Sequence, residues 1–211
     1  MKKFRIFADF DKEERFLNTT AGKGFRLVRH NTASLWYVFT PAEPAKLNYR
    51  VDFRQFKNKR EYHDYLALFD ESGWEHICGS YRSGSHYFLP AEGGARTEDI
   101  FSDADSKAGR FKRYAMNCIT IFFVILMYIF ILQDSLKTVG WSFLEPRSWY
   151  FTPGIWEKTS VDFWRAFLFE TPFAIMRSGL PFIVLIALMF INGALTVKTL
   201  LLYKGNKQKR L

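Results

Sequence analysis

Residues 115–133 read AMNCITIFFVILMYIFILQ, and this stretch decides the architecture of the chain because it contains no charged side chain. A helix rises about 1.5 Å per residue, so a helix of this length spans roughly 28 Å. The hydrocarbon core of a bilayer is about 30 Å thick. The sequence therefore predicts a membrane-spanning helix over residues 115–133.

A second apolar run covers residues 180–203. Pro181 falls in the first turn, where its missing N–H is tolerated, and Lys198 lies near the other end, where its long side chain can reach the headgroups. We expect a second membrane helix over these residues. Within it, Asn192 and Gly193 form a polar, small-residue patch that favours close packing against another helix.

The segment between the two runs, residues 134–179, contains an aromatic stretch at 161–176, VDFWRAFLFETPFAIM. Its three charged residues would cost several kcal/mol at bilayer depth, which favours a helix lying in the membrane interface over a third span. An odd number of spans would also place the basic C-terminal tail outside. We expect Trp164 and Phe167 to lie at the membrane surface.

Cations flank the outer ends of the two predicted spans. They are Arg110, Lys112, Arg113, Lys204, Lys207, Lys209 and Arg210, whereas only Lys137 and Arg177 lie close to the other two ends. Because cytoplasmic flanks carry the excess of Lys and Arg, we expect a two-span protein of the cell membrane with both termini in the cytoplasm. Arg110, Lys112, Arg113, Lys204 and Lys207 are the residues that we expect to meet the headgroups. Residues 204–211 form a basic tail.

The N-terminus has no apolar segment typical of a signal peptide, so we expect the first 114 residues to stay in the cytoplasm. Residues 1–92 resemble an internal duplication with an offset of 49 residues. The matched pairs are Phe4/Phe53, Arg5/Arg54, Phe7/Phe56, Leu17/Leu66, Gly24/Gly73, Phe25/Trp74, Val28/Ile77 and Phe39/Phe88.

Each half has an alternating strand, an acidic-started helix, a glycine followed by an aromatic residue, and two further alternating runs. This order predicts two βαββ units in an α+β fold, with an antiparallel sheet related to the ferredoxin-like plan and both helices on one face. Residues 93–114 are predicted to be a polar, basic juxtamembrane linker.

Candidate binding residues lie on the strands of the predicted sheet. Trp36, Val38, Tyr49 and Val51 fall on the opposite face from Tyr37, Phe39, Arg50 and Asp52, and the sequence leaves open which face meets the helices. Arg50, Asp52 and Arg54 alternate along one strand and so share a face, which suits either an electrostatic docking strip or a solvated sheet surface. Trp36 and Tyr49 add aromatic side chains to the candidate partner-binding set. An uncovered aromatic face could bind a peptide, a ligand or a protein, or could pack against the membrane or a second copy of the chain.

The sequence gives little support for a catalytic site or a metal site. Cys78 and Cys118 form no CxxC motif, and His76, Cys78 and His86 lack an evident fourth ligand. The sequence also lacks the spacing of a phosphate loop and a nucleophile elbow. We therefore expect no catalytic residue, no metal and no cofactor, and we expect that the protein is not an enzyme. An enzyme acting on a lipid or nucleotide at the membrane-facing sheet is left open as an alternative.

The formal net charge of +9 is compatible with a nucleic-acid partner. The net charge is +4 over residues 1–114, where acidic residues dilute the basic ones, 0 over residues 134–179, and +5 in Lys198 with the C-terminal tail. No helix-turn-helix pattern is present, so we expect no direct contact with nucleic acid. The charge is better explained as a record of topology, with cations held against anionic headgroups.

Several ordered motifs resemble the bacterial membrane-protein family catalogued as domain of unknown function 2812. They are Glu14-x-Phe16-Leu17-Asn18, Ala21-Gly22-Lys23-Gly24-Phe25, Tyr49-Arg50-Val51-Asp52-Phe53, Glu61-Tyr62, Gly73-Trp74-Glu75, Tyr87-Phe88, Ile100-Phe101-Ser102-Asp103 and Phe111-Lys112-Arg113. The resemblance covers about residues 2–114. It implies regulation or sensing, in the company of a PadR-type winged-helix repressor, and transfers no catalytic residue.

These features together predict a membrane-anchored cytosolic module that binds a protein or small ligand and has a regulatory role. Its expected partners are the lipid bilayer and a protein, either a regulator or another membrane protein. Association with a second copy is left open. The alternative is an immunity or accessory subunit of a membrane transporter.

Overall fold

The computed structural model describes residues 1–31, 35–93, 99–137 and 140–208. Residues 94–98 of the predicted linker and residues 209–211 of the predicted tail, with Lys209 and Arg210, lie outside the described residues. The chain divides into two compact units, one formed by Met1–Asn117 with Leu195–Leu211 and the other by Cys118–Ala194.

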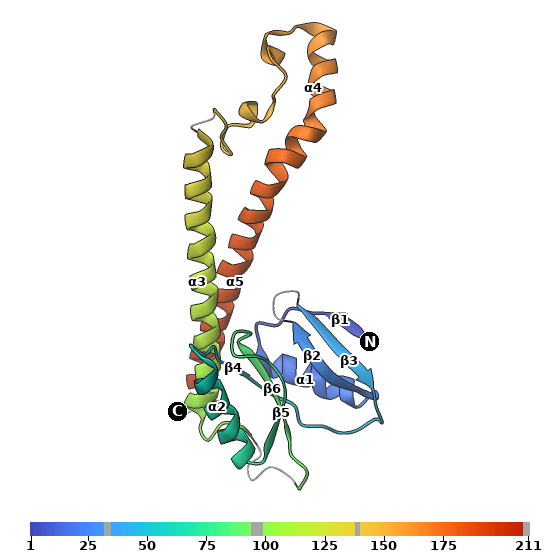
Figure 1. The fold of residues 1–211 in the computed structure, drawn as a ribbon, viewed down its shortest axis with the longest axis vertical. Coiled ribbons are helices and arrows are strands. Elements are labelled where there is room, and N and C mark those ends of the chain that lie inside the picture. The colour runs from blue at the N-terminus through green and yellow to red at the C-terminus, as the bar shows by residue number, and fades with distance from the viewer. Residues whose placement is uncertain (32–34, 94–98, 138–139, 209–211) are drawn as a thin grey trace. The chain divides into compact units, whose positions relative to one another are not determined.

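The first half of the domain consists of strand β1 (Lys2–Phe4), helix α1 (Phe10–Ala21), strand β2 (Phe25–Asn31) and strand β3 (Trp36–Pro41). These strands form an antiparallel sheet in the order β1-β3-β2 (Figure 1). Helix α1 begins where Asp9 Oδ1 accepts hydrogen bonds from the backbone N–H groups of Asp11 and Lys12. Such a cap stabilises donors that have no partner within the helix.

The second half repeats this order with strand β4 (Arg50–Phe53), helix α2 (Lys59–Glu71), strand β5 (Trp74–Cys78) and strand β6 (Ser85–Pro90). Its sheet has the order β4-β6-β5. Asn58 caps α2 by accepting a hydrogen bond from Glu61 N at 2.9 Å. Asn58 lies 49 residues after Asp9, so the two caps are equivalent.

The duplication extends to the backbone. Lys3 pairs with Tyr37 in the first sheet, as Asp52 pairs with His86 in the second. The ladder between the last two strands shifts register at Leu27/Arg29 in one half and at His76/Cys78 in the other. Each of these positions is offset by 49 residues, which confirms the predicted repeat.

The α+β class and the two βαββ units agree with the prediction, whereas the single sheet is replaced by two three-stranded sheets. Strands β2 and β5 contact one another at the junction of the two halves. Both carry the bulges described above, and a bulge leaves a residue unpaired and bends the strand. Each sheet has its own helix on the equivalent face, because Phe16 of α1 contacts Tyr37 and Phe39 while Tyr65 of α2 contacts His86 and Phe88.

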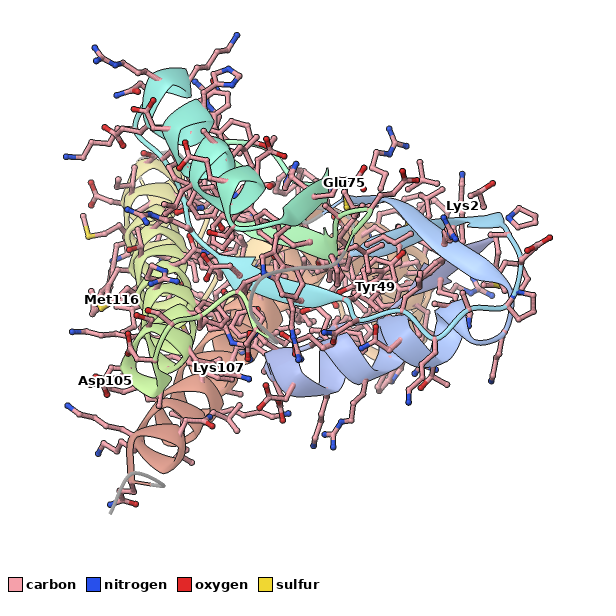
Figure 2. The ribbon with its side chains drawn as sticks, turned by 90° about the horizontal axis from the view of Figure 1, so that it is seen from below. Lys2, Tyr49, Glu75, Asp105, Lys107 and Met116 are labelled. Carbon is pink, nitrogen blue, oxygen red and sulfur yellow. The ribbon has the colours of Figure 1, made fainter. Side chains whose placement is uncertain are left out.

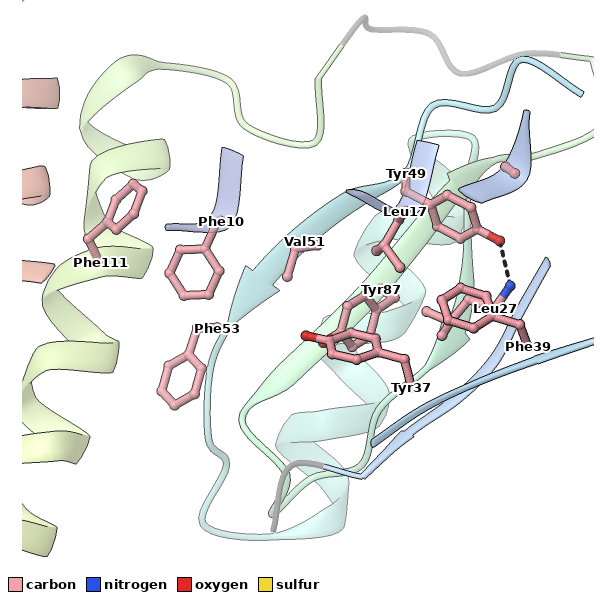
Figure 3. Packing of buried hydrophobic residues seen from close by; sticks show 11 residues of the cluster. Phe10, Leu17, Leu27, Tyr37, Phe39, Tyr49, Val51, Phe53, Tyr87 and Phe111 are labelled. Atoms are coloured by element: carbon pink, nitrogen blue, oxygen red, sulfur yellow. Dashed lines mark hydrogen bonds between the residues drawn. The ribbon is translucent and has the colours of Figure 1, made fainter. Parts of the chain in front are cut away.

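Two hydrophobic clusters hold the domain together. The larger cluster consists of Phe10, Leu17, Ala21, Leu27, Tyr37, Phe39, Tyr49, Val51, Phe53, Tyr87 and Phe111 (Figure 3). The smaller cluster joins Phe56 and Tyr65 to Trp74 and Phe88. Tyr87 and Phe88 are neighbours on β6 and point to opposite faces, yet both are fully buried. The second sheet is therefore covered on both sides.

Helix α3 (Ala104–Lys137) begins inside the domain. Ala108, Phe111 and Ala115 are buried, and this spacing places them on one side of the helix. The Phe111 ring lies 5.0 Å from that of Phe10, and Figure 3 shows it beside the core cluster. From Ala104 onward, the segment predicted to be a polar linker is thus helical, and one side of it belongs to the domain core.

The second unit contains the remainder of α3, two short 3-10 turns at Pro146–Trp149 and Ile155–Glu157, and helix α4 (Ser160–Ala174). Helix α4 continues through a π-helical turn, Ile175–Gly179, directly into helix α5 (Leu180–Gln208). The predicted interfacial helix and second span are therefore parts of one continuous helix. Both segments are apolar, and a π turn inserts one extra residue without ending the helix.

Two helical segments are long and apolar enough to cross a membrane, Ala104–Lys137 and Ser160–Gln208. Large apolar side chains such as Val124, Phe130 and Phe190 are exposed along them. Exposed apolar surface of this extent marks an interaction site for lipid or protein.

Candidate functional site: ion pairs at the start of helix α3

Arg110 is the seventh residue of α3 and is completely buried. Its Nη1 donates hydrogen bonds to Glu14 Oε1 and to the carbonyl oxygen of Val51, each at 2.6 Å. Its Nη2 donates to Asp11 Oδ1 at 2.6 Å. A guanidinium group suits this position because it is planar and carries several donors. Arg110 thus ties α3 to both α1 and β4.

Glu14 is the acceptor at the centre of this arrangement. It lies on α1 and is buried. Besides Arg110, it accepts hydrogen bonds from Val51 N at 3.1 Å and from Arg50 Nη1 at 3.2 Å. Removing one partner from a buried ion pair leaves an uncompensated charge, which typically costs 3–5 kcal/mol. Glu14 and Arg110 are therefore mutually dependent.

Arg113, one turn further along α3, binds the other end of β4. Its Nη2 donates to Asp52 Oδ1 at 2.6 Å, and its Nε donates to the carbonyl oxygen of Phe53 at 2.5 Å. The second oxygen of Asp52 accepts a hydrogen bond from the Tyr65 hydroxyl at 2.9 Å. Burial and the neighbouring Asp52 carboxylate raise the pKa of Tyr65. The Tyr65 hydroxyl therefore remains a donor to Asp52.

Asp99 and Lys107 complete the set. Lys107 Nζ lies 2.7 Å from Asp99 Oδ2, and Arg50 Nε lies 3.7 Å from Asp99 Oδ1. Figure 2 shows Lys107 on α3. We call the eight residues the ion-pair cluster: Asp11, Glu14, Arg50, Asp52, Asp99, Lys107, Arg110 and Arg113. The cluster contains four anions and four cations, so its formal charges cancel.

A second buried network adjoins the ion-pair cluster. Glu13 Oε1 accepts hydrogen bonds from the hydroxyl groups of Tyr37 and Tyr87, each at 2.6 Å. The Tyr87 oxygen lies 2.8 Å from His30 Nδ1. Burial raises the pKa of Glu13 to about 7, while burial lowers the pKa of His30 to about 4. Glu13 is therefore a buried carboxyl group that titrates near neutral pH.

The structure divides the predicted partner-binding residues. Arg50 and Asp52 belong to the ion-pair cluster, and Tyr49 is buried with its hydroxyl accepting a hydrogen bond from Leu27 N at 3.1 Å. Trp36 is exposed on the first sheet. Arg54 is exposed after β4, where its guanidinium group lies over the rings of Phe56 and Tyr65. The five residues therefore do not form one surface, because burial of β4 against α1 and α3 removes Tyr49 and Asp52 from it.

The predicted headgroup residues also separate into two groups. Arg110 and Arg113 bind carboxylates of the domain, and Arg110 is buried too deeply to meet a headgroup. Lys112, Lys204 and Lys207 are exposed. Helix geometry explains this separation. Arg110 and Arg113 are three residues apart and share the side of α3 that faces Glu14 and Asp52, whereas Lys112 lies on another side.

In the second unit, Trp164 is exposed on α4, and the ring of Phe167 stacks on that of Tyr150 at 5.2 Å. Asn192 donates a hydrogen bond to the carbonyl oxygen of Leu188 in its own helix at 2.9 Å. A Cβ atom at Gly193 would lie 3.8 Å from the ring of Phe122 on α3. Gly193 is thus placed opposite α3.

A cavity of about 570 Å³ lies in the second unit, within the range of small-molecule sites. Its lining includes Leu136 at the end of α3, Trp141, Phe151, Arg177 and Ser178. Trp141 Nε1 donates to Ser178 Oγ at 3.0 Å, and the Arg177 guanidinium group lies 3.7 Å from the centre of the Phe151 ring. The cavity therefore combines aromatic walls with one cation.

Sequence reasoning missed the structural role of the acidic partners. Asp11, Glu13 and Glu14 lie at the start of α1, where the helix dipole favours acidic residues. Because the dipole already accounts for them, the sequence does not reveal their contacts with distant residues. The described part of the chain holds no group of three or more His, Cys, Asp or Glu side chains placed to bind a metal ion.

An α+β domain whose core helix continues into an apolar segment long enough to cross a membrane defines the class of this protein. The chain belongs to a family described as protein of unknown function, DUF2812, whose model matches residues 9–124. The match includes every residue of the ion-pair cluster and continues into the apolar part of α3. Searches among curated proteins and among solved structures found no match.

Proposed function

We propose that this protein is a membrane-anchored sensing module with a regulatory role and no catalytic chemistry. Its two apolar helices cross the cell membrane, with both termini in the cytoplasm. The observation that carries the proposal is the burial of Arg110, because it makes the first turns of α3 part of the domain core. A displacement of α3 would therefore act on the domain directly.

The contacts of Arg113 supply a path from α3 to the surface. Arg113 binds Asp52, Asp52 binds the Tyr65 hydroxyl, and the exposed Arg54 lies over the Tyr65 ring. Asp52 and Tyr65 are buried, and hydrogen-bonded groups at low dielectric respond together because each polarises the next. A change at Arg113 would thus alter the surface around Arg54, where we place the contact with a protein partner.

The other end of α3 supports a role for the cavity as the sensory site. Leu136 lines it, and Leu136 and Arg110 belong to the same uninterrupted helix. We assign the input to a membrane-active compound that occupies this cavity. Its aromatic walls suit the apolar part of such a compound, and the Arg177 guanidinium group suits a polar or anionic part.

We assign the protein partner at this surface to a transcriptional regulator of the PadR type, which the family resemblance suggests. The test places a photo-crosslinking amino acid at the exposed Gln55, next to Arg54, in the full-length protein in native membranes. The matched control places it at the exposed Ala67 on α2. We expect a regulator to be recovered from position 55 and not from position 67.

Deletion of the gene should also change the expression of the genes that the regulator controls. Recovery of no regulator, together with unchanged expression after deletion, would contradict the proposal. Recovery of a permease from either position would instead favour the alternative, an immunity or accessory subunit of a transporter.

A further inference from the structure

The two halves of the domain differ in how their equivalent sheet faces are covered. In the second half, Val51 and Tyr87 lie on the face that packs against the larger hydrophobic cluster, and both are fully buried. Their equivalents 49 residues earlier are Lys2 and Val38, and Lys2 is exposed. This face of the first sheet is therefore open, whereas the equivalent face of the second sheet is covered.

The open face carries large apolar side chains. Phe4 is 52% exposed, Val28 is 52% exposed and Trp36 is 42% exposed. Phe4 and Trp36 are paired across β1 and β3, and their rings lie 5.6 Å apart in an edge-to-face arrangement. The neighbouring Ile6 is also about half exposed, at 49%. The contact between Phe4 and Trp36 joins these two side chains into one apolar centre, and exposed apolar surface of this kind marks an interaction site.

Cations surround this centre. Lys2 and Arg29 both pair with Val38 in the ladder, and Arg26 pairs with Thr40, so the three cations lie on the face that carries Trp36. All three are exposed. Figure 2 marks Lys2 on this sheet. Strands β1, β2 and β3 contain no acidic residue, whereas strands β4 and β5 contain Asp52 and Glu75.

We propose that the open face of the first sheet, formed by Lys2, Phe4, Arg26, Val28, Arg29 and Trp36, docks onto the anionic surface of a lipid bilayer. The cations complement anionic headgroups, and aromatic side chains favour the boundary between headgroups and acyl chains. The domain is covalently joined to apolar helices, which holds it at a high effective concentration near the bilayer. The proposal therefore requires only weak affinity for lipid.

The test uses the full-length protein in nanodiscs, with Cys78 and Cys118 replaced by alanine. A fluorophore on Val28→Cys reports on the open face, and the same fluorophore on Ala67→Cys, on the exposed side of α2, is the matched control. The nanodiscs contain phosphatidylcholine, alone or mixed in equal parts with phosphatidylglycerol. Each also carries a lipid with a quenching spin label near the headgroup.

We expect quenching at position 28 in the anionic nanodiscs, little quenching there in phosphatidylcholine, and little at position 67 in either. Each well-placed cation contributes about a fivefold factor to such binding, so Arg26→Gln with Arg29→Gln should weaken docking roughly 25-fold. The control pair Lys59→Gln with Arg60→Gln removes the same charge from the exposed start of α2 and should leave docking unchanged.

Equal quenching at positions 28 and 67 would overturn the proposal, because it would indicate a domain that meets the bilayer in no fixed orientation. Quenching at position 28 that changes neither with phosphatidylglycerol nor with the arginine substitutions would also overturn the proposal. A third contrary result is a label at position 28 that responds to added double-stranded DNA but not to anionic nanodiscs. That result would assign the face to a nucleic acid.

Discussion

Arg110 Nη1 donates a hydrogen bond of 2.6 Å to Glu14 Oε1, and the two residues are 96 positions apart in the chain. This bond links the first helix of the domain to the helix that continues into the apolar segment. It is surrounded by aromatic rings, with the guanidinium group 5.2 Å from the ring centres of Phe10 and Phe101. The contact thus lies in the dry core, where its loss has the largest effect.

Substitution of Arg110 tests the energetic role of this contact. Arg110→Met keeps an extended apolar side chain but leaves Glu14 without its strongest partner, so we expect the free energy of unfolding to fall by about 3 kcal/mol. Denaturant unfolding of the detergent-solubilised protein measures it. Lys112→Met, at an exposed neighbouring position, should change it by less than about 0.5 kcal/mol.

Adding Glu14→Gln to Arg110→Met should restore part of the lost stability, because no buried charge then lacks its partner. If Arg110→Met and Lys112→Met had the same small effect, the ion pair would contribute little to the domain.

Glu13 predicts a pH dependence of stability. Its pKa is about 7 in the folded domain and 4.5 in the unfolded chain, so the folded state binds the proton more tightly. The stabilisation is complete below pH 4.5 and is lost as the pH rises to about 7. Over that interval the wild type should lose about 3 kcal/mol relative to Glu13→Gln. The measurement is the free energy of unfolding of the wild type and of Glu13→Gln across this pH range, and parallel pH dependences of the two would contradict the prediction. The control is Glu75→Gln at an exposed site, which should follow the wild type and not Glu13→Gln.

Two glycines at the end of α1 provide a matched test of the backbone. Gly24 has a φ of +82°, and a Cβ atom there would lie 2.9 Å from the carbonyl oxygen of Ala42. Gly22 has a φ of −62° and room for a methyl group. We expect Gly24→Ala to lower the midpoint of thermal unfolding, at a cost of about 1–3 kcal/mol. Gly22→Ala should leave it unchanged or raise it slightly. Equal effects would show that the left-handed conformation at Gly24 is not required.

The proposed topology can be tested with an impermeant thiol reagent on a variant that lacks Cys78 and Cys118. Lys158→Cys lies at an exposed position between the two apolar helices, and Lys204→Cys lies at an exposed position after the second. We expect Lys158→Cys to react in intact cells and Lys204→Cys to react only after the membrane is permeabilised. Reaction of Lys204→Cys in intact cells would contradict two spans with a cytoplasmic C-terminus.

Most of the domain's secondary structure could be predicted from the sequence, but the ion pairs of its core could not. The offset of 49 residues that relates Gly24 to Gly73 was sufficient to predict both βαββ units, since turns and alternation are local signals. The partners Glu14 and Arg110 carry no such signal. Each has a local explanation, the helix dipole for Glu14 and the flank of a span for Arg110, and only the tertiary fold brings them together.

The division into two sheets and the continuity of α4 with α5 were beyond sequence reasoning for a related reason. Both are tertiary features, because β2 and β5 each carry a bulge where the two halves meet, and α4 runs into α5 through the π turn at Ile175–Gly179. Composition alone does not distinguish a bulged edge strand from a regular one. It also does not distinguish a helix that ends from one that continues with an extra residue.

The most direct test of the central claim is amide hydrogen exchange of the full-length protein in nanodiscs, comparing residues 104–117 of α3 with β4. If the start of α3 is part of the domain core, both segments should be protected to the same degree and should open together. Arg110→Met should then speed exchange in both, and Lys112→Met in neither. Rapid exchange of residues 104–113 beside a fully protected β4 would contradict the account, because it would show a linker that is independent of the domain.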